Sequence, residues 1–87
     1  MFVILTYDVN RKLVSKVMKT CRKYLFHVQN SVFEGTITEA KLKRLKGELE
    51  NKIDKTADRI CVYEFDSTKY SRKVQLGSVE EISNIID

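Results

Sequence analysis

The first nine residues, MFVILTYDV, carry apolar side chains at both odd and even positions. Alternate residues of a strand point to opposite faces of a sheet, so a strand made from this run has two apolar faces. Such a strand belongs in the middle of a sheet that is covered on both sides. A chain of 87 residues has room for one compact domain, so the cover must come from the same domain or from a partner.

Two later stretches repeat apolar residues at the three- and four-residue spacing of an amphipathic helix. In residues 11–25, which Asn10 can cap, the apolar stripe consists of Val14, Val17, Met18, Cys21, Tyr24 and Leu25. In residues 39–54, which Thr38 can cap, it consists of Leu42, Leu45, Leu49 and Ile53. We expect two helices, with Lys41, Lys43, Arg44 and Glu48 pointing away from the second stripe.

Four further segments are typical of strands. Residues 26–30 and 32–37 alternate in polarity, residues 59–65 are apolar on both faces and are expected to be central, and residues 73–77 form a short half-buried strand. The order predicts an α+β fold of the ferredoxin-like βαββαβ kind, with an extra C-terminal strand and both helices on one face of the sheet. We assign residues 1–77 to this domain and residues 78–87 to a C-terminal tail, for which a partner subunit offers a packing surface.

The face of the sheet without helices needs a second cover. In the first strand that face carries Phe2, Ile4, Thr6 and Asp8, while Val3, Leu5, Tyr7 and Val9 lie on the other face. Because both sets are apolar, the helix-free face is expected to pack on a partner. The simplest partner is a second copy of the chain in a two-fold homodimer.

The chain is basic, with 16 Lys and Arg against 12 Asp and Glu, a net charge of +4 and a pI of about 9.1. Lys12, Lys16, Lys19 and Lys23 follow one line of the first helix, and no acidic residue lies between positions 9 and 33. One interpretation is a solvated helix face. The other is a ridge that binds a polyanion such as nucleic acid.

The sequence offers few groups for catalysis. It has no phosphate-binding glycine loop and no zinc-ligand spacing, and its one histidine, His27, lies in a strand pattern with no nearby carboxylate. Cys21 and Cys61 lie in apolar patterns, so we expect buried free thiols in a reducing compartment. With no signal-peptide pattern and no apolar run long enough to span a membrane, the expected location is the cytoplasm.

Asp8 is the carboxylate that stands out, because it ends the apolar first strand. It can cap the turn that begins near residue 11, or it can bind a metal. Magnesium takes oxygen ligands and accepts one or two carboxylates together with water and substrate phosphates. A two-fold axis at the strand end would supply a second Asp8 to one Mg²⁺, which gives a site suited to phosphodiester hydrolysis.

Two segments of the sequence resemble a known family, CRISPR-associated protein two. Residues 3–9, VILTYDV, resemble the opening strand of that family, and residues 28–35, VQNSVFEG, match its V-Q-x-S-V-F-E-G segment. Residues 58–65 resemble its fourth strand, so the likeness covers about residues 1–77.

The resemblance implies a ferredoxin-like homodimer with metal-dependent endonuclease activity on single-stranded RNA or double-stranded DNA. It assigns Asp8 to the shared Mg²⁺ and, with Tyr7, to catalysis, and it places Ser31 and Phe33 near the site. It also implies a role in spacer acquisition, in which the dimer holds a DNA duplex and bridges copies of the CRISPR integrase without depending on cleavage. Nucleic acid would then contact the basic side chains of the first helix, which are Arg11, Lys12, Lys16, Lys19 and Lys23.

Three hypotheses therefore remain at the level of the sequence. The chain is a DNA-binding scaffold of spacer acquisition, a magnesium-dependent endonuclease, or both. The alternative is a ferredoxin-like domain outside CRISPR, either a toxin-like endoribonuclease or a regulator that binds a small ligand, because this fold supports many functions.

Overall fold

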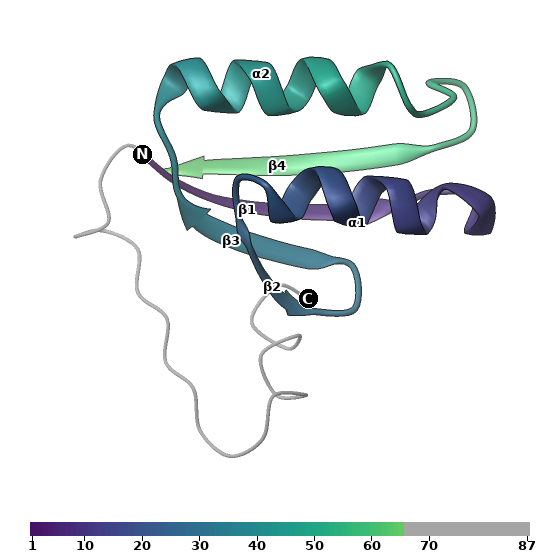
Figure 1. Ribbon diagram of the computed structural model, residues 1–87, viewed down its shortest axis with the longest axis horizontal. Helices are drawn as coiled ribbons and strands as arrows, with labels where there is room; N and C mark the ends of the chain where they lie inside the picture. Colours follow the sequence, from purple (N-terminus) through teal and green to yellow (C-terminus); the bar gives the residue numbers. More distant parts are fainter. Residues whose placement is uncertain (66–87) are drawn as a thin grey trace.

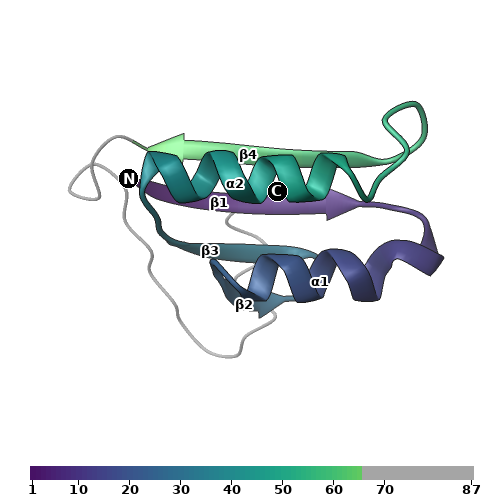
Figure 2. The same cartoon turned by 45° about the horizontal axis from the view of Figure 1, so that its top comes forward.

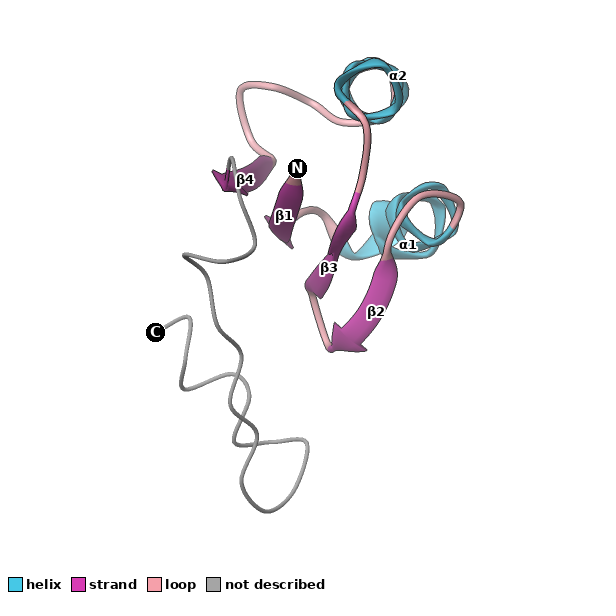
Figure 3. Ribbon diagram, turned by 90° about the vertical axis from the view of Figure 1, so that its left-hand side faces the viewer, coloured by secondary structure: helices cyan, strands magenta, loops and turns pink. Residues whose placement is uncertain are grey.

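The sheet has four antiparallel strands in the order β2-β3-β1-β4, and both helices pack on one of its faces (Figures 1 and 3). The structure is a computed structural model that describes residues 1–65. Its elements are β1 (Phe2–Asp8), the 3-10 turn η1 (Arg11–Leu13), α1 (Val14–Arg22), β2 (Phe26–Gln29), β3 (Val32–Thr36), α2 (Glu39–Glu50) and β4 (Arg59–Phe65). This is the expected ferredoxin-like order. The strand expected at 73–77 and the tail at 78–87 lie outside the described residues.

The core lies between the sheet and the two helices. Val3, Leu5, Phe33, Val17, Cys21 and Leu45 have no exposed surface. Figure 2 shows α2 running along β1 and β4, while α1 lies over β2 and β3. The stripes expected for the two helices therefore face the sheet, and β1 is central, as its sequence predicts.

Both helices are shorter than their apolar patterns predict. α1 ends at Arg22, yet Tyr24 and Leu25 beyond it still pack in or against the core. α2 ends at Glu50, while Ile53 packs against the core from the following turn. The expected caps are confirmed: the Asn10 side chain accepts from the Lys12 amide at 2.9 Å, and the Thr38 hydroxyl accepts from the Lys41 amide at 3.2 Å.

The prediction that residues 59–65 form a central strand is wrong for the described part of the sheet. β4 pairs with β1 alone and lies at the edge, and its Ile60, Cys61 and Val62 are half-buried. Cys61 is therefore less buried than expected, whereas Cys21 is fully buried, and both are free thiols.

The β2–β3 hairpin turns through Asn30, which has a φ of 42°. Asparagine tolerates this left-handed conformation better than most residues. The pairing of β2 with β3 shifts register between His27 and Gln29, and β2 ends at Gln29. The Ser31 carbonyl then accepts from the Tyr7 amide at 3.2 Å, which fixes the turn to the end of β1.

Candidate functional site

Asp8 is the last residue of β1 and is exposed. The alternating burial of β1 places it on the helix-free face together with Phe2, Ile4 and Thr6. Arg59 is its direct neighbour in β4, but the two side chains form no ion pair. Within residues 1–65 the Asp8 carboxylate has no hydrogen bond, so its oxygens are available to a ligand.

The cap of the following turn is Asn10, so the alternative of a capping role for Asp8 is wrong. Asn10 uses its own side chain on the Lys12 amide, and its carbonyl accepts from the Leu13 amide at 2.8 Å. Its backbone amide in turn donates to Oδ1 of Asp58 at 2.8 Å. The hydrogen bonds of Asn10 thus hold the segment after Asp8 in place, and the Asp8 side chain takes no part in them.

Asp58 links two connections of the chain. Its Oδ1 holds the Asn10 amide, and its Oδ2 accepts from the Asp54 amide at 2.9 Å. Asp54 itself accepts from the amide and the hydroxyl of Thr56, and these hydrogen bonds lower the pKa of the Asp54 carboxyl. Sequence reasoning missed Asp58, because its contact with Asn10 spans 48 positions and no local pattern indicates it.

Tyr7 lies on the opposite face of β1 from Asp8. Its side chain is 8% exposed, and its ring centroid lies 6.3 Å from that of Phe33. Burial and the neighbouring Cys21 thiol raise the pKa of the Tyr7 hydroxyl, and the charge of Arg22 opposes this shift. The structure therefore brings Tyr7 and Phe33 together in the core beneath α1, and does not bring Tyr7 beside the Asp8 carboxylate.

The other groups with potential chemistry have structural surroundings. Burial raises the pKa of the Cys21 thiol to about 12, which keeps it protonated. The His27 ring stacks on Phe33 with centroids 4.7 Å apart, and its Nε2 donates to the Asn30 carbonyl at 2.7 Å. His27 thus supports the hairpin, in agreement with the structural interpretation of its sequence position.

The lysine ridge, defined as Lys12, Lys16, Lys19 and Lys23, is exposed along η1 and α1, together with Arg11. Lys12, Lys16 and Lys19 form no ion pair with the described residues, but Lys23 is bound by Glu48 of α2. Glu48 also accepts a hydrogen bond from the Tyr24 hydroxyl. The expectation that Glu48 points away from the packing face is therefore wrong, because it is half-buried and contacts Lys23 and Tyr24, which follow α1.

The contacts of Glu48 shift the pKa of all three side chains. The hydrogen bonds from Lys23 and Tyr24 lower the pKa of the Glu48 carboxyl. The same hydrogen bonds raise the pKa of the Lys23 ammonium and of the Tyr24 hydroxyl. One end of the lysine ridge is thus neutralised, and the free positive charge is concentrated at Lys12, Lys16 and Lys19.

A single copy of the chain does not form a complete metal site in its described part. No group of three or more His, Cys, Asp and Glu side chains comes together in residues 1–65. Asp8 therefore offers one carboxylate, and further ligands must come from outside these residues. In the same part of the chain, no helix is long and apolar enough to cross a membrane.

Comparison with known proteins gives matches over most of the chain. The family model described as CRISPR associated protein Cas2 matches residues 1–73. The chain is 49% identical over 77 residues to a CRISPR-associated endoribonuclease Cas2 of Dictyoglomus turgidum, covering 88% of each protein. It is 46% identical over 85 residues to a CRISPR-associated endoribonuclease Cas2 of Thermodesulfovibrio yellowstonii, covering 98% of this chain and 97% of the relative.

Solved structures agree with the sequence matches. A crystal structure of a Cas2 protein superimposes with a TM-score of 0.79 at 35% identity, covering 90% of this chain and 86% of that one. The crystal structure of Streptococcus pyogenes Cas2 at pH 6.5 superimposes with a TM-score of 0.76 at 38% identity, covering 88% of this chain and all of that one. Similarity in sequence and in fold thus points to one group of proteins.

Proposed function

Because the chain belongs to the CRISPR-associated Cas2 family, we propose that it works in spacer acquisition as a homodimer that binds duplex DNA and bridges the integrase. We also propose a Mg²⁺-dependent endonuclease activity, on single-stranded RNA or double-stranded DNA, centred on Asp8. The observation that carries this proposal is the exposed Asp8 carboxylate without a partner in residues 1–65, at the end of a central strand and on the helix-free face.

The helix-free face supports the dimer. Neighbouring strands place Phe2 beside Phe65, with ring centroids 6.0 Å apart, and Ile4 beside Tyr63. Tyr63 is 49% exposed, although an aromatic ring of this size is normally buried at least in part. A two-fold contact between two such faces would bury these rings and would bring Asp8 of one copy toward Asp8 of the other.

The residues present fit a magnesium ion in their chemistry. A carboxylate oxygen is the ligand that Mg²⁺ prefers, and the ion retains several waters, so one carboxylate from each copy suffices to anchor it. When bound, the ion supplies Lewis-acid activation of a phosphodiester and of a water molecule. This chain contributes Asp8 as the anchor, and the Asp58 and Asn10 contact holds the chain beside it.

Tyr7, Ser31 and Phe33 act in this proposal as positioning residues. Tyr7 packs its ring on Phe33, and its amide donates to the Ser31 carbonyl. These contacts fix the end of β1 from the helix side, so that the Asp8 carboxylate leaves the sheet in one direction. The proposed contribution of Tyr7 to catalysis is therefore rigidity, since its hydroxyl lies on the face opposite Asp8.

The lysine ridge supports nucleic-acid binding that does not depend on sequence. Lys12, Lys16 and Lys19 are exposed on the helix layer, away from the face proposed for dimer contact. Exposed ammonium groups bind backbone phosphates and release counterions, which gives affinity that falls with salt. A dimer with its sheets facing inward would present one such ridge on each outer side.

The test compares wild-type protein with Asp8→Asn. We expect the variant to lose Mg²⁺-dependent cleavage of RNA and DNA while its fold and dimer are unchanged, because asparagine keeps the shape and loses the charge. Glu39→Gln, an exposed carboxylate on the helix side, is the matched control and should cleave normally. Cleavage by Asp8→Asn at the wild-type rate would contradict the nuclease proposal.

The scaffold role needs a separate measurement. We expect the integrase encoded beside this protein to be captured by it in a pull-down, and spacer integration to proceed with both wild-type and Asp8→Asn protein. Failure to capture the integrase or to bind duplex DNA would contradict the scaffold role and leave the cleavage result as an independent finding.

A further inference from the structure

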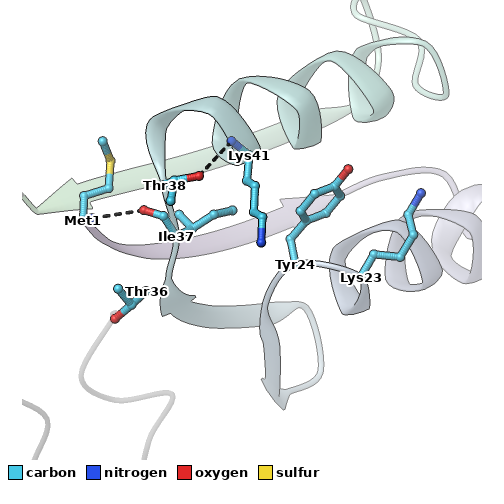
Figure 4. A pocket seen from close by; sticks show the side chains of 7 residues that line it. All are labelled: Met1, Lys23, Tyr24, Thr36, Ile37, Thr38 and Lys41. Carbon is cyan, nitrogen blue, oxygen red and sulfur yellow. Dashed lines mark hydrogen bonds between the residues drawn. The ribbon is translucent and has the colours of Figure 1, made fainter.

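A cavity of about 320 Å³ lies at the end of the molecule away from Asp8. It is open to solvent, and the turn after α1, the end of β3 and the first turn of α2 line it (Figure 4). Its lining residues are Met1, Lys23, Tyr24, Thr36, Ile37, Thr38 and Lys41. β1 begins beside the cavity and ends at Asp8, so a strand of about 20 Å separates the two places.

Lys41 gives this cavity a positive charge that is not paired. Its side chain leaves the first turn of α2 and runs down past Tyr24 (Figure 4). Lys41 forms no ion pair with the described residues, unlike Lys46 and Lys55 of the same region, which pair with Glu64 and Glu50. The ammonium group is therefore available to an anion that enters the cavity.

The acidic side chains nearby do not cancel this charge. Glu48 has both carboxylate oxygens occupied, one by Lys23 and one by the Tyr24 hydroxyl. Glu39 is exposed in the first turn of α2 and does not line the cavity. Thr38 adds a hydroxyl beside Lys41, and the start of α2 adds the partial positive charge of a helix N-terminus.

We propose that this Lys41 cavity is a second nucleic-acid contact, which binds one phosphate group of the bound polymer. The inference rests on the proposed function only for the identity of the ligand. The phosphate is either a backbone phosphodiester or a terminal phosphate, since both present the same oxygens to Lys41 and Thr38. Such a contact at the far end of the helix layer would extend the surface used for binding from the lysine ridge on α1 to the start of α2.

The first experiment uses inorganic phosphate and needs no nucleic acid. We expect phosphate to shift the amide NMR signals of Thr38 and Lys41 in wild-type protein, and this response to be lost in Lys41→Gln. Lys43→Gln is the matched control, because Lys43 is also exposed on α2 but does not line the cavity. An unchanged spectrum in wild-type protein, or equal responses in the two variants, would overturn the cavity as a phosphate site.

The second experiment identifies the source of the phosphate. With short duplexes, Lys41→Gln should lower the salt dependence of binding, measured as the slope of log K against log salt, by about one, while Lys43→Gln leaves it unchanged. If the loss of affinity is larger with a 5′-phosphate than with a 5′-hydroxyl, the ligand is the terminal phosphate, and if it is equal, the ligand is the backbone. Identical slopes for both variants would overturn the nucleic-acid contact, whereas the Asp8→Asn result would stand unaffected.

Discussion

Asp58 accepts a hydrogen bond from the backbone amide of Asn10 at 2.8 Å, which ties the loop before β4 to the segment that follows Asp8. The two residues are 48 positions apart in the sequence, and a second oxygen of Asp58 holds the Asp54 amide. The proposed ligand Asp8 therefore lies at the end of β1, next to a turn that the Asp58 carboxylate holds in place. Asp58 is a positioning residue in this arrangement.

We expect Asp58→Ala to loosen this turn. Two backbone amides lose their acceptor, which should lower the free energy of unfolding by about 1–2 kcal/mol. Cleavage should fall as well, with little change in the Mg²⁺ concentration needed for half-maximal activity, because Asp8 itself is intact. Thermal denaturation and a Mg²⁺ titration of cleavage check this expectation.

Asp58→Asn is the conservative counterpart, since its one side-chain oxygen can still accept from the Asn10 amide. It should recover a large part of both the stability and the cleavage. A loss of stability in Asp58→Ala with unchanged cleavage would show that Asp58 supports the fold without positioning Asp8.

A second prediction concerns pH and Glu48. The hydrogen bonds from Lys23 and Tyr24 place the pKa of folded Glu48 below its ordinary value of 4.5. At pH values above 4.5, the ordinary pKa that Glu48 has in the unfolded state, its full contribution to the stability of the folded state is present. This contribution is lost as the pH falls through the lower pKa of the folded state. In Glu48→Gln, the free energy of unfolding should decline less steeply between pH 4.5 and more acidic values than it does in wild-type protein.

Urea denaturation at a series of pH values measures this slope. Glu39→Gln is the control, because that carboxylate is exposed in the same helix and has no hydrogen-bond partner in residues 1–65. Tyr24→Phe should reproduce part of the effect by removing one of the two donors. Equal acid slopes in wild-type protein and Glu48→Gln would mean that the contacts of Glu48 with Lys23 and Tyr24 do not form in solution.

The sequence predicts the order of elements and their buried faces, because both follow from apolar periodicity. It does not predict where the helices end. Leu25 is 5% exposed and Ile53 packs against the core, yet both lie outside a helix. Periodicity reports burial, and a turn that continues beyond a helix can bury the same face as the helix itself.

The candidate site is predictable only in part for a related reason. Asp8 stands out because a carboxylate ends an apolar strand, and strand alternation alone places it opposite Tyr7. The contacts of Asp58 with Asn10 and of Glu48 with Tyr24 join residues far apart in the sequence, with no local pattern to announce them. Such pairs depend on how the elements pack, which local patterns of apolar and polar residues do not reveal.

A third prediction tests the proposed dimer through Tyr63. Tyr63→Glu places a carboxylate on the helix-free face, between the apolar surfaces that are proposed to meet. An unpaired buried charge costs about 3 kcal/mol or more, which corresponds to about a 100-fold increase in the dissociation constant. Sedimentation velocity should show two-chain particles for wild-type protein and single chains for Tyr63→Glu.

Ser15→Glu serves as the control for the dimer, since it adds the same charge at an exposed position of α1 on the helix side. It should remain a two-chain particle. Dissociation of both variants, or of neither, would contradict the helix-free face as the dimer contact.

The last prediction separates the free and the paired members of the lysine ridge. Lys12, Lys16 and Lys19 are exposed without an ion pair in residues 1–65, whereas Lys23 is held by Glu48. Replacing the first three by alanine should lower the slope of log K against log salt for duplex binding by up to about three, since each phosphate contact contributes about 0.9. Adding Lys23→Ala should change the slope little.

The control is Lys46→Ala combined with Lys55→Ala, which removes two paired lysines near the other edge of the molecule. This double variant should leave the slope close to the wild-type value. Fluorescence anisotropy at several salt concentrations measures all of these slopes, and an unchanged slope in the triple variant would remove the ridge from the binding surface.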